Sequence, residues 1–138
     1  MKLILHQAKS EEANDLLGLY LEFFKSTGME AVFCKPEQRH DVIAWIQKYI
    51  NEHKVWVWSL DGCPVALAQV VPCKNELFAI VVNYENRNSG IGKTIIGDLK
   101  SQYSSLNTKP VTKAAKVLFS RCGFQPLKSN QSVWEWKS

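Results

Sequence analysis

Residues 75–97 contain the part of this sequence best suited to bind an anion. The apolar run 77–82 is followed by a polar turn and then by Arg87-Asn88-Ser89-Gly90-Ile91-Gly92-Lys93-Thr94, which we expect to open a helix. The backbone N–H groups in the first turn of a helix lack partners and lie at the positive end of its dipole. Because glycines let a ligand approach the backbone closely, the segment predicts a phosphate-binding loop.

Two common phosphate motifs do not fit this loop. The P-loop pattern Gly-x-x-x-x-Gly-Lys-Ser/Thr matches Gly92-Lys93-Thr94, but Arg87 stands where its first glycine belongs. The dinucleotide pattern Gly-x-Gly-x-x-Gly matches Gly90 and Gly92, but Ile95 replaces its third glycine. Both nucleotide interpretations are therefore weakened.

A third pattern, Arg/Gln-x-x-Gly-x-Gly/Ala, fits Arg87, Gly90 and Gly92. Here the chain resembles the GNAT superfamily of acetyl-CoA-dependent N-acetyltransferases. A second match lies at Ala115, which is followed eight residues later by Gly123-Phe124, as in the family's fourth helix. The resemblance implies that this loop binds the pyrophosphate of coenzyme A. The residues implied to contact acetyl-CoA are Ile80, Val82, Arg87, Asn88, Ser89, Gly90, Ile91, Gly92, Lys93 and Thr94.

The resemblance also implies where the thioester lies. In the family, the strand before the signature separates from the strand after the following helix, and the pantetheine arm enters the gap. Here these strands are residues 77–82 and the short piece around Leu106, so the main chain at Ile80 and Val82 would bind pantetheine. A backbone N–H at this place would stabilise the oxyanion of the transition state.

Direct acetyl transfer needs a base for the ammonium form of the acceptor and an acid for the departing thiolate. Glu76 is the candidate base, eleven positions before Arg87, although a solvated carboxylate at a strand end is the simpler interpretation. The family's usual acid, a tyrosine, is replaced by Phe119, and a common asparagine is replaced by Thr112. Either water or Ser120 donates the proton to the departing thiolate in place of the tyrosine, or the domain binds acetyl-CoA without efficient turnover.

Two functions follow from these residues. The first is an N-acetyltransferase that transfers the acetyl group of acetyl-CoA to an amine of a small molecule, peptide or protein by direct attack, with no metal required. The alternative is a catalytically weak acetyl-CoA sensor that regulates a protein partner. Nucleic-acid binding, suggested by a net charge of +4 and by Trp56-Val57-Trp58, is disfavoured because the basic residues are scattered.

The elements that must position these residues follow from hydrophobic periodicity. Strands are expected at residues 3–5, 55–58, 65–71, 77–82, near 106 and at 132–136. Helices are expected to begin at Ser10, at Pro36, after Gly90 and near Thr112. With a second strand after the last helix, the expected order is β-α-α-β-β-β-α-β-α-β-β. It agrees with the α+β, mixed α/β fold implied by the resemblance: a mostly antiparallel, twisted sheet of six to seven strands flanked by four helices.

Length and composition bound the remaining possibilities. A chain of 138 residues, 46% hydrophobic and 22% charged, predicts a single domain over 1–138. Its apolar runs are too short for a membrane span or a signal peptide, so we expect no membrane contact and a cytoplasmic location. The four cysteines have no metal-like spacing and are expected to be free, buried thiols. The resemblance further implies a homodimer.

Overall fold

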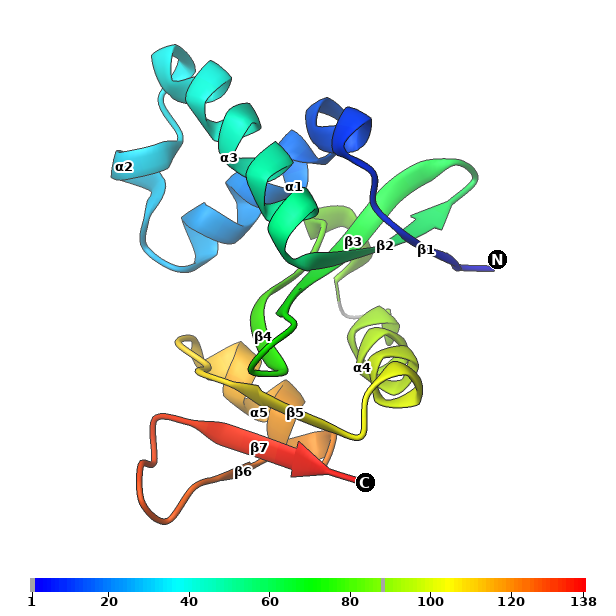
Figure 1. Cartoon of the computed structure of the whole chain (residues 1–138), viewed down its shortest axis with the longest axis vertical. Coiled ribbons are helices and arrows are strands. Elements are labelled where there is room, and N and C mark those ends of the chain that lie inside the picture. Colours follow the sequence, from blue (N-terminus) through cyan, green and yellow to red (C-terminus); the bar gives the residue numbers. More distant parts are fainter. Residues whose placement is uncertain (1, 88) are drawn as a thin grey trace.

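The computed structural model describes residues 2–87 and 89–138, which form a seven-stranded sheet flanked by helices (Figure 1). Neighbouring strands follow the order β1-β2-β3-β4-β5-β7-β6. Each neighbouring pair is antiparallel except β4 and β5, which run parallel. The strands are β1 (Ile4–Gln7), β2 (Lys54–Leu60), β3 (Cys63–Val71), β4 (Glu76–Val82), β5 (Ser105–Thr108), β6 (Gln125–Pro126) and β7 (Trp134–Lys137).

The helices confirm the predicted order and add one short element. They are α1 (Ala13–Ser26), α2 (Glu30–Phe33), α3 (Arg39–Glu52), α4 (Ile91–Gln102) and α5 (Lys113–Arg121). The sequence predicts the four long helices but not α2, because one turn of helix is too short to show a periodic pattern. Ser10 and Pro36 open single 3-10 turns that lead into α1 and α3, so both predicted helix starts lie in these turns.

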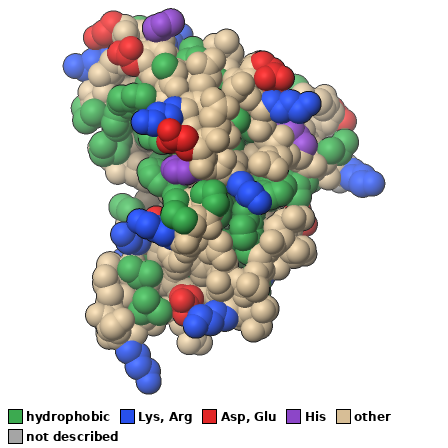
Figure 2. Space-filling view, in the orientation of Figure 1, with side chains coloured by type: hydrophobic (Ala, Val, Ile, Leu, Met, Phe, Trp, Pro, Cys, Tyr) green, Lys and Arg blue, Asp and Glu red, His purple; other side chains and the backbone are tan. Residues whose placement is uncertain are grey.

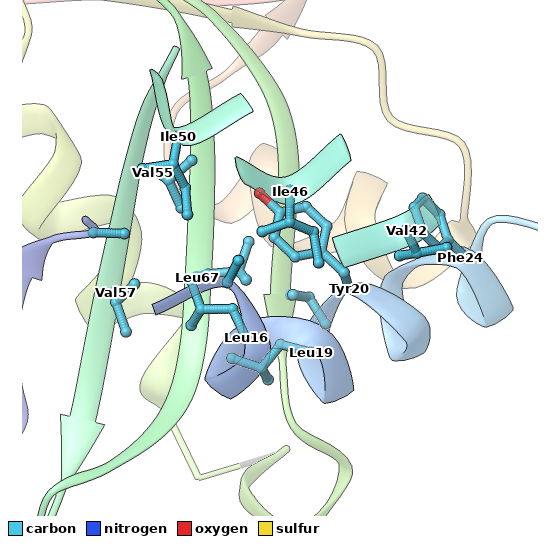
Figure 3. Packing of buried hydrophobic residues seen from close by; sticks show 13 residues of the cluster. Leu16, Leu19, Tyr20, Phe24, Val42, Ile46, Ile50, Val55, Val57 and Leu67 are labelled. Carbon is cyan, nitrogen blue, oxygen red and sulfur yellow. The ribbon is translucent and has the colours of Figure 1, made fainter. Parts of the chain in front are cut away.

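Two hydrophobic clusters lie on opposite faces of the sheet, because side chains alternate along each strand. On one face, α1 and α3 bury Leu16, Tyr20 and Ile46 against Val57 and Leu67 (Figure 3). The other face carries α4 and α5. Its buried side chains include Trp58, Ala68, Leu77, Ile95, Leu99, Leu106 and Phe119. The sheet is therefore covered on both faces, and β4 runs through the middle of it.

The cysteines correct one expectation. They are free, as predicted, but none is fully buried: Cys63 and Cys73 are exposed, and Cys34 and Cys122 are half-buried. Cys63 begins β3 beside a hairpin turn and Cys73 lies in the turn before β4, so both stand at the rim of the sheet rather than in its core. Among the described residues, no helix is long and apolar enough to cross a membrane.

Candidate functional site

Strands β4 and β5 pair at one point and then separate. The parallel ladder between them contains the pair Glu76 and Asn107, where the Asn107 N–H donates to Asn75 O at 3.0 Å. One residue further on, Thr108 Oγ1 donates to Leu77 O at 3.0 Å, so a side chain replaces the next backbone bond. Beyond this point, the described residues show no further pairing between the two strands. The predicted gap therefore begins after Leu77.

The main chain at Ile80 and Val82 faces this gap. Asn83 N–H donates to Val65 O on β3 at 2.8 Å, and backbone groups point to opposite edges at successive strand residues. Val81 and Asn83 therefore bond toward β3, while Ile80 and Val82 direct their N–H and C=O groups the other way. The carbonyl of Val82 accepts a hydrogen bond from Arg87 Nε at 3.0 Å, which confirms its direction.

The glycine loop leads directly from β4 into α4. Gly90 precedes the helix with φ of 83°, a left-handed conformation that disfavours a side chain. The first helical hydrogen bond runs from Thr94 N–H to Gly90 O, so the N–H groups of Ile91, Gly92 and Lys93 lack helical acceptors. The loop thus presents free N–H groups at the positive end of α4. Asn88, part of the predicted loop, lies outside the described residues.

A groove of about 840 Å³ connects the gap with this loop. Its described lining residues include the cations Arg87, Lys93, Lys113 and Arg121, and no carboxylate. Gly92 belongs to the floor where α4 meets α5: a Cβ built on it would lie 3.2 Å from the side chain of Leu118. The groove therefore combines free backbone N–H groups with a positive potential, which suits a long polyanionic ligand.

A second, smaller hollow of about 100 Å³ adjoins the groove. The two cavities share Ser26, Ile80, Thr112 and Ala115 in their walls. The other residues that line the hollow are Phe23, Thr27, Leu77, Phe78, Thr108, Lys109, Pro110, Val111 and Phe119. Thr112 also caps α5, because its hydroxyl accepts from Ala115 N at 3.1 Å. A ligand extended along the groove would therefore reach the hollow past Ile80.

Glu76, the predicted base, is not among the described residues that line either cavity. It is the first residue of β4, and its side chain is 21% exposed. Its Oε2 lies 4.0 Å from Nζ of Lys109, which does line the hollow. The structure thus brings Ile80, Val82, Arg87, Gly90, Gly92 and Lys93 together in the wall of the groove. Ser89, Ile91 and Thr94 are not among the described residues of either cavity, and Glu76 contacts Lys109 without lining the hollow.

The residue at the usual acid position and the serine that follows it lie in different surroundings. Phe119 is 1% exposed in the wall of the hollow, with its ring centroid 5.0 Å from that of Phe124. Ser120 is exposed and is not among the described residues of either cavity. Of the two substitutes considered for the missing tyrosine, the structure therefore favours water over Ser120.

Sequence reasoning missed the aromatic and cationic side chains of the hollow, Phe23, Phe78 and Lys109. Phe23 forms part of a helix's apolar pattern, and Phe78 part of an apolar strand, so neither carries a signal of function in the sequence. Lys109 follows the short β5 directly. Its place just after a strand that borders the gap is the one clue, since residues at strand ends often carry function.

No family model matches this sequence, and no curated protein matches it. Solved structures do match. An acetyltransferase from Thermus thermophilus is 15% identical with a TM-score of 0.76, covering 100% of this chain and 98% of its own. The PaiA N-acetyltransferase of Thermoplasma acidophilum, solved with coenzyme A, is 16% identical with a TM-score of 0.75, covering 100% of both chains. A GCN5-related N-acetyltransferase from Rhodopseudomonas palustris is 14% identical with a TM-score of 0.74, covering 100% of this chain and 97% of its own.

These likenesses run over the whole length of the chain. They confirm the fold that the Arg87, Gly90 and Gly92 signature predicts. The protein has the fold of the GCN5-related N-acetyltransferases, the GNAT superfamily.

Proposed function

We propose that the protein transfers the acetyl group of acetyl-CoA to an amine by direct attack. The observation that carries this proposal is the continuity of the groove. It begins at the free N–H groups of α4, follows the unpaired edge of β4 past Val82 and Ile80, and ends at the small hollow. A ligand with a polyphosphate at one end and a thioester at the other matches this order of free N–H groups, unpaired strand edge and small hollow.

Each part of coenzyme A has its own contact in this proposal. The pyrophosphate binds the loop residues Arg87, Ser89 and Gly90, the free N–H groups of Ile91, Gly92 and Lys93, and the hydroxyl of Thr94. Asn88 belongs to the same loop by the sequence signature. The amides of the pantetheine arm pair with the main chain at Ile80 and Val82, which points into the gap. The coenzyme A complex of the Thermoplasma acidophilum protein, which has the same fold, supports this choice of cofactor.

The chemical step joins the acceptor nitrogen to the thioester carbonyl carbon and breaks the carbon–sulfur bond. A backbone N–H at Ile80 stabilises the negative oxygen while both bonds are partial. Glu76 accepts the acceptor's proton through a water molecule, because its carboxylate stands behind Lys109 rather than in the wall. The departing thiolate takes a proton from water, since Phe119 offers none.

The first test is calorimetric titration with acetyl-CoA. We expect Gly90→Glu to weaken binding by roughly 100-fold, because it adds an anion where the pyrophosphate would bind. Gly97→Glu is the matched control, since it places the same charge at an exposed position on the same helix, where a Cβ meets nothing within 4 Å. Absence of binding by the folded wild-type protein, or equal binding by both variants, would overturn the proposed cofactor site.

The second test concerns the chemical step. Release of free thiol from acetyl-CoA is followed with a panel of amines for wild-type protein and Glu76→Gln. We expect roughly a 100-fold drop in kcat for the variant, within the range for loss of a general base, with unchanged affinity for acetyl-CoA. An unchanged kcat would remove Glu76 from the mechanism without affecting the cofactor site.

One observation favours the sensor alternative. Phe119 fills the tyrosine position with a buried ring, so the described residues of the hollow include no phenol to protonate the thiolate. Thiol release by Phe119→Tyr separates the two functions. A rise of about tenfold over wild type indicates an enzyme limited by its acid. Tight acetyl-CoA binding with no thiol release by either protein, whatever the amine, indicates a sensor.

A further inference from the structure

The hollow where the groove ends has an aromatic wall that the chain itself leaves open. Phe23 and Phe78 line it with ring centroids 6.4 Å apart, and Phe78 is 46% exposed although it belongs to a central strand. Figure 2 shows hydrophobic side chains exposed in a band across the middle of the molecule, with Lys or Arg side chains beside them. An exposed aromatic ring at the end of a binding groove offers apolar contact to a ligand.

The position of Phe78 follows from an irregularity in the sheet. Ala79 pairs with Gln69 and Leu77 pairs with Val70, so the register shifts and Phe78 is left without a partner on β3. Such a bulge redirects a side chain, and here the Phe78 ring lies 6.1 Å from the ring of Tyr49 on α3. The bulge therefore turns an aromatic side chain toward the helices that border the hollow.

A buried hydrogen-bond network holds this wall in place. Tyr20 OH donates to Gln69 Oε1 at 2.8 Å, and Gln69 Nε2 donates to His53 Nδ1 at 2.8 Å. His53 stacks on Tyr49 with an angle of 8° between the rings. Burial raises the pKa of Tyr20, with a smaller contribution from Tyr49, so its hydroxyl keeps the proton that it donates. The hydrogen bonds tie Gln69, on the β3 side of the bulge, to Tyr20 of α1 and to His53 at the end of α3, and Tyr49 of α3 contacts the ring of Phe78 on the β4 side. This arrangement favours a preformed aromatic surface.

The charge of the hollow is positive. Lys109 is the charged residue among the described lining residues, and no carboxylate lines the hollow with it. Its side chain is 65% exposed, and the contact with Glu76 keeps the ammonium group near the start of β4. A polyamine or a lysine-rich peptide would find no acidic side chain among the described lining residues, since Glu76 stands outside them, whereas a carboxylate near the acceptor amine would find the ammonium group of Lys109.

The volume limits the size of the ligand. The hollow, at about 100 Å³, is comparable to the ~150 Å³ cavity that holds a single benzene ring. A volume of this order suits one ring, with the rest of the ligand outside the hollow. From the aromatic wall, the single cation and this size, we infer that the acceptor is a small aromatic amino acid, with its ring against Phe23 and Phe78 and its carboxylate at Lys109. This assignment rests on the proposed acetyl transfer.

Four amines test the assignment in the thiol-release assay. Phenylalanine is compared with phenylalaninamide, which lacks the carboxylate, with alanine, which lacks the ring, and with spermidine, a polycation. We expect kcat/KM to fall about fivefold for the amide, consistent with an exposed ion pair, and at least tenfold for alanine. Spermidine should be the poorest acceptor. Equal rates for the acid and the amide, or a preference for spermidine, would overturn the assignment.

Two variants locate the contacts. Lys109→Met should abolish the difference in kcat/KM between phenylalanine and its amide. Phe78→Ala should abolish most of the preference for phenylalanine over alanine. Lys128→Met is the matched control, because Lys128 is exposed and is not among the described residues of either cavity. If the ratio of kcat/KM for phenylalanine to that for its amide is the same in Lys109→Met as in Lys128→Met, the carboxylate does not bind Lys109 and the assignment is wrong.

A binding measurement separates this inference from the proposed function. Phenylalanine is titrated calorimetrically into protein saturated with coenzyme A, and the titration is repeated with Lys109→Met. Binding that the variant weakens, without thiol release from acetyl-CoA, would support the ligand class and overturn acetyl transfer. Transfer to other amines without any binding of phenylalanine would overturn the ligand class and leave acetyl transfer intact.

Discussion

The groove and the hollow adjoin each other, yet they are built in different ways. Half of the groove's described lining residues come from one continuous stretch, the end of β4, the glycine loop and the start of α4, and nearly all the others come from α5 and its cap. The hollow takes its walls from three separate segments: the end of α1, β4, and residues 108–119, which run from the end of β5 into α5. The groove is cationic, whereas the hollow is aromatic with a single cation among its described residues.

This difference follows from what each cavity has to hold. Phosphates and amides can be bound by backbone N–H and C=O groups, so the groove depends on helix geometry, on glycine and on an unpaired strand edge. An acceptor is selected by side chains, which can be exchanged without changing the fold. Changes in the groove should therefore alter the affinity for acetyl-CoA whichever acceptor is used. Changes in the hollow should alter which acceptor is preferred.

The largest effect is expected where the hollow and the core share a side chain. Phe119→Ala should lower the free energy of unfolding by about 3–5 kcal/mol, because it removes a ring that is 1% exposed and packs against Phe124. Val117→Ala on the same helix, at a position 42% exposed, should change it by less than about 0.5 kcal/mol. Urea unfolding measures both. A similar loss in the two variants would show that the hollow's wall is not part of the core.

The next effect should be confined to the groove. Gly92→Leu places a side chain against Leu118, whose Cδ2 lies 3.2 Å from a Cβ built on Gly92, and forces α4 away from α5. We expect stability to fall by about 1–3 kcal/mol, and calorimetry to show acetyl-CoA binding about tenfold weaker.

A second substitution is the control for the contact between the leucine side chain introduced by Gly92→Leu and Leu118. Leu118→Ala, combined with Gly92→Leu, vacates the space and should restore most of the affinity and stability. Binding of phenylalanine in the hollow should stay within twofold throughout. If the double variant binds acetyl-CoA no better than Gly92→Leu, contact between α4 and α5 is not the cause of the loss.

The point where the gap begins should give a smaller effect. Thr108→Val removes the hydroxyl that donates to Leu77 O and leaves a buried carbonyl without its partner, which should cost about 1–2 kcal/mol in urea unfolding. Thr108→Ser keeps the hydroxyl and should retain the hydrogen bond. A loss in Thr108→Ser as large as that in Thr108→Val would show that keeping the hydroxyl does not preserve the stability, and the hydroxyl would then have no part in holding β4 beside β5.

Local signals explain what the sequence could predict. The glycine loop combines a strand, a turn and a helix start within one short segment, so its position and its role as a helix N-terminus follow from residue types alone. The gap between β4 and β5 was implied by the resemblance. Its exact start after Leu77 depends on the hydroxyl of Thr108, which comes from another strand.

Long-range contacts explain what the sequence could not predict. The bulge that exposes Phe78 depends on pairing with Gln69 and Val70, and no residue near Phe78 marks it. The contact between Glu76 and Lys109 joins the start of β4 to the residue after β5, and the predicted base is not among the described residues that line the hollow. The predicted burial of the cysteines was wrong for a related reason: Cys63 is apolar in type, but it lies at a hairpin end.

The smallest predicted effect is a change in the alkylation rate of Cys122, whose thiol responds to the charge in the groove. Burial raises the pKa of the Cys122 thiol, while the positive charges of Lys100 and Lys93 lower it by a smaller amount. Lys93 also lines the groove, so phosphates bound there would cancel part of its potential and raise the pKa of the thiol further. Because the thiolate is the reactive form, acetyl-CoA should slow alkylation of Cys122 at pH 8 by about twofold.

Mass spectrometry after iodoacetamide treatment measures this rate for each cysteine in the same sample. Cys63 is the internal control, because it is exposed at a hairpin end and is not among the described residues of the groove. Phenylalanine alone, bound in the hollow, should leave the rate at Cys122 unchanged, since the hollow's cation is Lys109 rather than Lys93. Faster alkylation of Cys122 with acetyl-CoA would place the phosphates away from Lys93, and equal slowing by both ligands would mean that the two cavities respond as one.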